Sequence, residues 1–203
     1  MFAMTTQFNF FHEPEREAAV LEGFRYQPEF ISASDEPALL TRVRELPFRP
    51  FEFHGYLGKR RTVSFGWQYE FSGGGKLQKA GDIPDFLLPL RSLAASFAAL
   101  EPEDFEHALV IEYGPGSGIG WHRDKAVFGE VVGVSLLAPC TLRFRRKAGT
   151  NWQRVNISTA PRSAYLLTGP ARSEWQHSIL RVDALRYSIT FRQVLENSHR
   201  KDA

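Results

Sequence analysis

Apolar and polar residues alternate along most of the second half of the chain, in short runs divided by turn residues. Glycine and proline signals such as Gly114-Pro115-Gly116 and Gly169-Pro170 separate these runs. Many short strands with such punctuation, and no helical crossover between them, indicate an antiparallel sandwich or jelly roll rather than a parallel sheet. The strands are expected at residues 105–113, 130–137, 141–146, 152–158, 162–167, 175–180 and 185–194.

The first hundred residues mix strand and helix periods. We expect a short strand at 24–31 and a helix that begins at Ser34 as its N-cap and ends before Pro47. A second amphipathic helix is expected to run to about Leu100, with Pro89 in its first turn. Residues 51–71 are aromatic and extended, and the glycine-rich stretch 72–76 is predicted to be a surface loop or a mobile lid.

The chain of 203 residues is expected to form a single domain, 1–203. Its parts are predicted to be an N-terminal arm (1–20), an N-terminal extension (21–100), a jelly-roll core (101–195) and a loose polar tail (196–203). Apolar residues make up 43% of the chain and charged residues 24%, which is the ordinary range for a soluble protein.

Composition narrows the partners and the compartment. A net charge of +2 permits a nucleic acid partner but does not argue for one. The single cysteine, Cys140, excludes an internal disulfide framework and fits a reducing cytosol, so a cytoplasmic location is expected. No apolar run approaches the roughly 18 residues of a membrane span, so no membrane association is expected. We expect a monomer.

The segment Trp121-His122-Arg123-Asp124 carries the main chemical signal. In an extended segment His122 and Asp124 point to the same side, where an imidazole and a carboxylate can bind a divalent metal. His177 lies on a late strand that a jelly roll would place nearby, and it can complete the two-His, one-carboxylate set of non-haem Fe(II) oxygenases. The remaining histidines are expected to be structural or solvated: His12, His54, His107 and His199.

The last predicted strand has one polar and one apolar face. Its polar face consists of Arg186, Ser188, Thr190 and Arg192. An exposed strand with its polar face in water would explain this pattern. Alternatively, the polar face lines a cavity, and two guanidinium groups there suit a dianion. Together with the metal set, the second arrangement suggests a dicarboxylate that chelates the metal.

These blocks, in this order, resemble the AlkB branch of the 2-oxoglutarate- and Fe(II)-dependent dioxygenases. The resemblance covers about residues 50–194 and is weaker over 61–73. It is strongest in 113–124, in Val134-Ser135-Leu136-Leu137, in Gly169-Pro170-Ala171-Arg172 leading to His177, and in 186–192.

The resemblance implies a mainly β (α+β) double-stranded β-helix with the N-terminal helices packed outside. It implies Fe(II) on His122, Asp124 and His177, and O2 activated there to give succinate, carbon dioxide and a hydroxylated substrate. An N-methylated base would then lose formaldehyde. The far carboxylate of 2-oxoglutarate would bind Arg186, and further contacts would come from Tyr113, Ser188, Thr190 and Arg192.

Two positions depart from the family pattern. Ile111 replaces an asparagine that faces the co-substrate, on the same strand face as Tyr113, so weaker 2-oxoglutarate binding is expected. Ala126 replaces an acidic residue that DNA-repairing members often use to read the exocyclic amine of the base. The second departure leaves the substrate open.

Candidate substrate contacts lie in two basic, aromatic segments. Arg61 in the basic turn 59–61, with Trp67 and Tyr69, falls where the family carries its nucleotide-recognition lid, about 51–76. Arg143 and Arg145 form a second basic run. Aromatic and basic side chains suit a flipped-out or single-stranded base, although solvated strand faces and core aromatics would explain them too.

Three functions therefore stay open. The leading hypothesis is a dioxygenase that dealkylates N-alkylated nucleobases in DNA or RNA. The second is the same chemistry on a protein side chain, a tRNA nucleoside or a small molecule. The third is a non-catalytic jelly-roll binding module.

Overall fold

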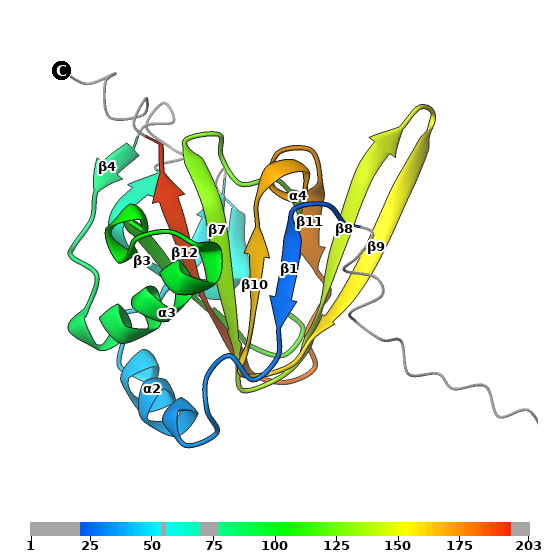
Figure 1. Ribbon diagram of the computed structural model, residues 1–203. Helices are drawn as coiled ribbons and strands as arrows, with labels where there is room; N and C mark the ends of the chain where they lie inside the picture. The colour runs from blue at the N-terminus through cyan, green and yellow to red at the C-terminus, as the bar shows by residue number, and fades with distance from the viewer. Residues whose placement is uncertain (1–20, 54–55, 70–76, 196–203) are drawn as a thin grey trace, which may run out of the picture.

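The computed structural model describes residues 21–53, 56–69 and 77–195, which form two antiparallel sheets with helices on one side (Figure 1). The strands are β1 (Phe24–Gln27), β2 (Arg49–Phe53), β3 (Tyr56–Tyr69), β4 (Leu77–Lys79), β5 (His107–Tyr113), β6 (Ile119–His122), β7 (Phe128–Leu136), β8 (Cys140–Ala148), β9 (Asn151–Thr159), β10 (Ser163–Leu167), β11 (Gln176–Ile179) and β12 (Arg186–Val194). The α-helices are α2 (Asp35–Arg44), α3 (Leu88–Ala98) and α4 (Gly169–Ser173), and two short 3-10 helices are η1 (Asp85–Leu87) and η2 (Pro102–Asp104).

The strands from β5 onward build a double-stranded β-helix. The large sheet has the order β1-β10-β7-β12-β5-β3-β2, with β4 paired to β3, and the small sheet has the order β6-β11-β8-β9. Apart from the β8–β9 hairpin, consecutive strands of the set β5 to β12 alternate between the two sheets. This topology confirms the predicted fold class.

The N-terminal segment extends the large sheet and covers its outer face. Strand β1 pairs with β10 at one edge, and β3 pairs with β5 at the other. Helices α2 and α3 pack on the face away from the small sheet, as predicted, through Leu40, Val43, Leu90 and Phe97. The predicted N-cap residue Ser34 makes no side-chain cap; the Ser32 hydroxyl instead accepts the backbone N–H of Asp35 at 3.1 Å.

Strand β12 separates the two cores. Tyr187, Ile189 and Phe191 belong to the cluster under the helices. The polar positions of the strand, Arg186, Ser188, Thr190 and Arg192, are all buried on its other face. The polar face therefore lines the space between the sheets and is not in water, which decides between the two arrangements that the sequence left open.

The other strand predictions are confirmed to within a few residues at their ends, and the predicted helices correspond to α2 and to η1 with α3. The predicted arm 1–20, loop 72–76 and tail 196–203 lie outside the described residues. Among the helices of the described part of the chain, none is long and apolar enough to cross a membrane.

Candidate metal centre and co-substrate site

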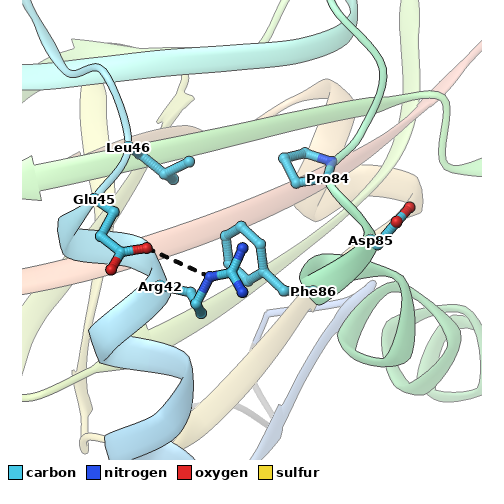
Figure 2. A pocket seen from close by; sticks show the side chains of 6 residues that line it. All are labelled: Arg42, Glu45, Leu46, Pro84, Asp85 and Phe86. Carbon is cyan, nitrogen blue, oxygen red and sulfur yellow. Dashed lines mark ion pairs between the residues drawn. The ribbon is translucent and has the colours of Figure 1, made fainter.

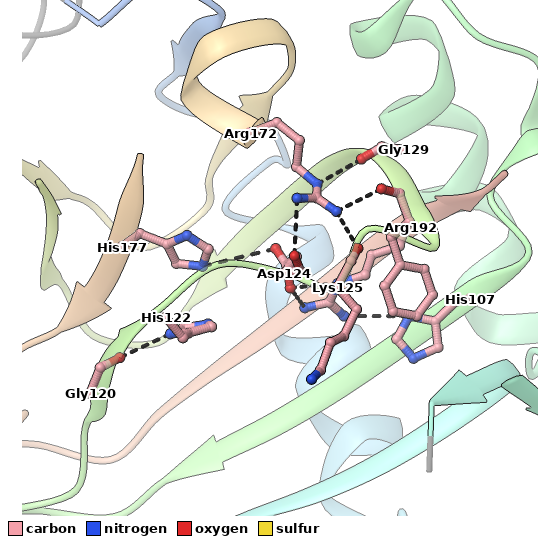
Figure 3. Close-up of polar contacts among 10 residues, drawn as sticks. His107, Gly120, His122, Asp124, Lys125, Gly129, Arg172, His177 and Arg192 are labelled. Atoms are coloured by element: carbon pink, nitrogen blue, oxygen red, sulfur yellow. Dashed lines mark hydrogen bonds and ion pairs between the residues drawn. The ribbon is translucent and has the colours of Figure 1, made fainter. Parts of the chain in front are cut away.

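His122, Asp124 and His177 come together between the two sheets. One potential ligand atom from each lies within 4.8 Å of the others. Two atoms that share one ion at about 2.1 Å lie roughly 3 to 4 Å apart, so the cluster is close to the size that a metal requires. The three side chains face one another in Figure 3. As predicted, the structure brings this set together, and its role as a ligand set stays a prediction.

Strand pairing positions the two imidazoles. His122 on β6 is the direct partner of His177 on β11, and their ring centroids are 4.2 Å apart. The glycine-rich turn before β6 allows this approach: a Cβ on Gly118 would lie only 2.7 Å from the Ile179 carbonyl oxygen, and Gly116 has a φ of +77°. The turn predicted at Gly114-Pro115-Gly116 therefore brings His122 next to His177.

The protonation states suit a metal. The Gly120 carbonyl oxygen lies 2.9 Å from His122 Nδ1, and because a carbonyl only accepts, Nδ1 donates and Nε2 keeps its lone pair for the centre. Burial lowers the pKa of His177 to about 3 and also lowers the pKa of His122. Both rings are therefore neutral near pH 7, as metal ligands must be.

Arg192 holds the Asp124 carboxylate. Its Nε and Nη2 atoms both donate to Asp124 Oδ1, at 3.1 and 2.9 Å, which leaves Oδ2 turned toward His177 Nε2 at 3.9 Å. Burial is the largest single effect and opposes ionisation of Asp124, but the neighbouring positive charges, with Arg192 first among them, together outweigh it, and the pKa of Asp124 lies well below its usual range. In the structure Arg192 thus contacts a candidate metal ligand, and its contact with 2-oxoglutarate stays a prediction.

Arg172 fixes the loop that follows Asp124. Its guanidinium donates to four backbone carbonyls, those of Asp124, Lys125, Phe128 and Gly129, as Figure 3 shows. Apart from the place of Arg172 in a family block, no pattern in the sequence predicts a role for this residue. Its role depends on where α4 packs against the loop, and no local pattern reports that.

His107 supports Arg192 from behind. It is 4% exposed, stacks on Phe128 at 5.0 Å, and its Nδ1 lies 3.4 Å from Arg192 Nη1. Burial, with the Arg192 charge, lowers the pKa of His107 well below its usual value. His107 is therefore a buried, neutral, structural histidine, in agreement with the role that the sequence assigned to it.

We expect His107→Gln to flatten the acid side of the stability profile. Below about pH 6.5 the unfolded chain protonates this histidine while the folded protein does not. As the pH is lowered, His107 therefore decreases the free energy of unfolding by about 1.4 kcal/mol per pH unit. Glutamine can still face Arg192 but does not titrate. Urea unfolding of the metal-free proteins between about pH 4.5 and pH 7 measures the difference; equal slopes for the two proteins would contradict the assignment.

Arg186 forms an anion site beside the cluster. It is 1% exposed, stacks over Tyr113 at 4.7 Å, and donates from Nη2 to the Ser135 hydroxyl at 2.7 Å. Its Nε and Nη1 atoms are buried without a hydrogen-bond partner. A buried guanidinium with two unused donors is costly unless an anion binds it, so these residues fit the carboxylate of 2-oxoglutarate.

The other predicted co-substrate residues line the same space. Tyr113, Ser188 and Thr190 are all buried on this side of the large sheet, and burial raises the pKa of the Tyr113 hydroxyl. Ile111 lies in the same core cluster as Tyr113, which confirms that the two share a face. Tyr165, which the sequence did not single out, crosses Gly133 so closely that a Cβ there would lie 2.3 Å from its ring.

Arg60 is a functional candidate that the sequence analysis missed. On β3, Arg60 lies two positions before Thr62, so the two side chains point to the same face. Thr62 pairs with Ile111, which places Arg60 on the inner face of the large sheet. Its Nε is buried without a hydrogen-bond partner, its guanidinium stacks on Phe51 at 3.8 Å, and its charge acts on Tyr113 and His122. Arg60 therefore places a positive charge at the border of the metal centre.

Arg61, the predicted substrate contact, lies on the opposite face. It donates to both carboxylate oxygens of Glu112, at 2.6 and 2.9 Å, and Tyr187 donates to the same carboxylate. Tyr187 belongs to the core under the helices, so this group is separated from the metal centre by the large sheet. The structure does not bring Arg61 to the candidate site.

We expect Arg61→Gln to leave substrate binding unchanged and to cost about 1 kcal/mol or less of stability, because the pair is partly exposed to solvent. Arg60→Gln is the matched variant, with the same change of charge one residue away, and it should raise the KM for substrate. Steady-state kinetics and urea unfolding separate the two. An equal rise in KM for both variants would return Arg61 to the site.

The other predicted substrate contacts are divided in the same way. Trp67 donates from Nε1 to Glu106 at 3.0 Å and lines a hollow with residues of α3, on the helix side. The Tyr69 ring lies 4.9 Å from the Lys125 ammonium group. Because Lys125 follows Asp124 in the sequence, Tyr69 borders the metal centre. Arg143 and Arg145 lie on the outer face of the small sheet, where their guanidinium groups stack on the Trp121 ring.

A hollow of about 470 Å³ lies elsewhere, between α2 and η1 (Figure 2). Its lining includes Phe86, which stacks under Arg42 at 5.3 Å, and Glu45, which pairs with Arg42 at 3.5 Å. The hollow lies on the helix side of the large sheet and contains none of the candidate ligands.

Comparison with known proteins agrees with this geometry. Residues 23–192 match the model of the 2OG-Fe(II) oxygenase superfamily. The chain is 25% identical over 213 residues to "Alkylated DNA repair protein ALKBH8 homolog" of Arabidopsis thaliana, covering 86% of this chain and 59% of that protein. It is 30% identical over 117 residues to "Probable RNA/DNA demethylase ALKBH6" of Danio rerio, covering 58% of this chain and 47% of that protein. The chain thus spans about half the length of these relatives.

Solved structures show the same fold. OsALKBH1 superposes with a TM-score of 0.63 at 16% identity, over 84% of this chain and 98% of that one. An oxidoreductase of the 2OG-Fe(II) oxygenase family from Burkholderia pseudomallei superposes with a TM-score of 0.61 at 14% identity, over 95% and 93%. With the family match over most of its length, the chain belongs to the 2OG-Fe(II) oxygenase superfamily and is one of its AlkB-like members.

Proposed function

We propose that this chain is a dioxygenase that removes alkyl groups from N-alkylated bases of DNA or RNA, with Fe(II), 2-oxoglutarate and O2. The observation that carries the proposal is the buried Arg186, with two unused donors, on the large sheet across the inter-sheet space from His122 and His177 of the small sheet. A metal set alone suits many proteins, whereas a metal set beside a dedicated carboxylate site suits a metal-chelating dicarboxylate.

Each residue of the centre has a task in this reaction. His122, Asp124 and His177 would hold the iron, and Arg186 would bind the far carboxylate of 2-oxoglutarate. When bound, these groups supply the oxidation of a substrate C–H bond by O2, with 2-oxoglutarate split to succinate and carbon dioxide. Arg192 keeps Asp124 ionised, and Arg172 holds the loop that carries it.

The choice of a nucleic acid substrate rests on charge and on relatives. Arg60 presents a positive charge at the border of the centre, and Lys125 and Tyr69 form a cation and aromatic pair beside Asp124. Such groups suit the phosphate and the face of an unpaired base. The names of both relatives refer to DNA repair or to RNA/DNA demethylation.

Formaldehyde release tests the proposal. The protein, Fe(II) and 2-oxoglutarate are incubated with methylated single-stranded DNA, methylated RNA or a pool of methylated peptides, and His177→Ala serves as the inactive control. We expect one of the nucleic acids to raise formaldehyde release well above the level without substrate. Release with peptides alone, or with no added substrate, would refute the nucleic acid assignment.

A further inference from the structure

The outer face of the small sheet is a continuous row of cations and tryptophans. Core residues such as Leu142, Phe144, Val155 and Ile157 mark the inner face, so the residues between them in sequence point outward. The outward side chains of this row come from three strands: Trp121 from β6, Arg143, Arg145 and Lys147 from β8, and Trp152 and Arg154 from β9.

The row is held together by stacking. The Arg143 and Arg145 guanidinium groups lie 4.8 and 4.4 Å from the Trp121 ring. Arg145 and Lys147 lie 4.3 and 4.8 Å from the Trp152 ring. Cations and aromatic rings therefore alternate from β6 to β9, over roughly 14 Å at about 4.8 Å per strand.

Arg143 and Arg145 are each positioned by one hydrogen bond from Nε, which leaves the two terminal nitrogens of each guanidinium group unused. Arg143 donates from Nε to the Ser178 hydroxyl at 3.0 Å, and Arg145 donates from Nε to Gln176 Oε1 at 2.7 Å. Within the described part of the chain, their terminal nitrogens make no hydrogen bond or ion pair. Fixed guanidinium groups with free terminal nitrogens lose little entropy when they bind an oxyanion such as phosphate.

The charge on this face has one sign. The strands β6, β8, β9 and β11 contain no Asp or Glu. The whole chain carries a net charge of only +2, so the positive charge of the face is a local excess and not a property of the whole surface. Free cations alternating with aromatic rings, without acids, favour single-stranded nucleic acid, because phosphates and unpaired bases alternate in the same way.

The face lies next to the candidate metal centre. Trp121 and Gln176 are the sequence neighbours of His122 and His177, on the opposite side of the same two strands. Strand β6 is the edge of the small sheet, so a polynucleotide can pass from the outer face around this edge toward the loop at Asp124. The β8–β9 hairpin extends beyond the two sheets in Figure 1 and lengthens the outer face at the edge opposite β6.

We propose that this outer face binds the single-stranded DNA or RNA that flanks the base in the metal centre. The inference rests on the proposed function and adds a second binding surface to it. The face binds the phosphate backbone and stacked bases without reading sequence, so the lesion is selected only at the centre.

Oligonucleotide binding by the full chain tests the inference. Unmethylated single-stranded DNA and RNA of the same mixed sequence are labelled, and fluorescence anisotropy gives Kd over a range of salt concentrations. The double variant Arg143→Gln/Arg145→Gln should weaken binding by on the order of tenfold and reduce the slope of log K against log salt by about 1.4, since each lost phosphate contact on a single strand removes about 0.7. Trp152→Ala should weaken binding about tenfold with little change of slope.

A matched control separates this effect from net charge. Arg25→Gln/Arg42→Gln removes two charges from the helix side of the large sheet, where these guanidinium groups stack on Phe97 and Phe86, and it should bind like the unaltered protein. The salt slope does not respond to a purely structural role, and thermal unfolding checks that each variant is folded. Arg143→Lys/Arg145→Lys should keep the slope, because charge is retained, and should lose part of the affinity.

The outcomes distinguish this inference from the proposed function. If Arg143→Gln/Arg145→Gln binds both DNA and RNA as the unaltered protein does, while the unaltered protein releases formaldehyde from a methylated trinucleotide, the outer face is not a binding surface and the proposed function stands. If the unaltered protein releases no formaldehyde from any methylated nucleic acid, both fail. Loss of affinity and slope confined to one nucleic acid identifies that one as the partner.

Discussion

Replacing Asp124 by alanine is expected to abolish turnover and to destabilise the protein at the same time. Asp124 is a candidate metal ligand, so its loss should cost more than the roughly 10–100-fold that loss of an outer-shell partner costs. It is also the partner of Arg192, whose guanidinium would remain buried without a carboxylate. Breaking a buried pair from one side costs about 3–5 kcal/mol.

Two measurements follow these effects separately. Under anaerobic conditions, Fe(II) and 2-oxoglutarate should give the intact protein a weak visible charge-transfer band, and Asp124→Ala should not show it. Urea unfolding of the metal-free proteins gives the loss of stability. The double variant Asp124→Ala/Arg192→Met removes the unpaired charge as well, so it should regain much of the stability and still lack the band. A band in Asp124→Ala would remove Asp124 from the ligand set.

The period-two pattern predicted most of the strands, and the expected jelly-roll topology indicated that His177 lies near His122. From Arg186 to Arg192 in β12 the polar and apolar residues alternate, which determined the two faces of the strand once one of them had to be buried. His122 and His177 could be paired in advance because the ends of a jelly roll are adjacent in space. Asp124 lies just past the end of β6, so its place beside them depends also on the contacts of Arg172 and Arg192.

The choice between Arg60 and Arg61 could not be made from the sequence. Two adjacent residues of a strand point to opposite faces, and a shift of one residue in register exchanges them. The register is set by the pairing of β3 with β5, which places Arg61 opposite Glu112 and Thr62 opposite Ile111. Only the acidic residue at 112, read together with that register, could have shown that Arg61 is the one that is paired.

The roles of Arg172 and Tyr165 could not be predicted from the sequence for another reason. Arg172 binds four carbonyl groups of a loop more than 40 positions earlier, and Tyr165 fills the space above Gly133. Backbone carbonyls carry no sequence signal, and a glycine that makes room for a distant ring looks like any other glycine. Such contacts become visible only when the strands are assembled.

Replacing Arg186 by methionine is expected to weaken 2-oxoglutarate binding by roughly 10–150-fold, because a hydrogen bond to a charged group contributes about 1.5–3 kcal/mol. Without co-substrate the same variant should be at least as stable as the intact protein, since it removes a buried guanidinium whose Nε and Nη1 have no partner.

Unfolding in urea with and without 2-oxoglutarate tests both halves of this prediction for Arg186. At a concentration of about 100 times Kd, the co-substrate should stabilise the intact protein by about 2.7 kcal/mol, and the methionine variant should lose most of this gain. Arg186→Lys keeps the charge but not the fork, so it should fall between the two. A methionine variant that is destabilised on its own and still gains the full stabilisation would show that Arg186 is a structural residue and that the carboxylate binds elsewhere.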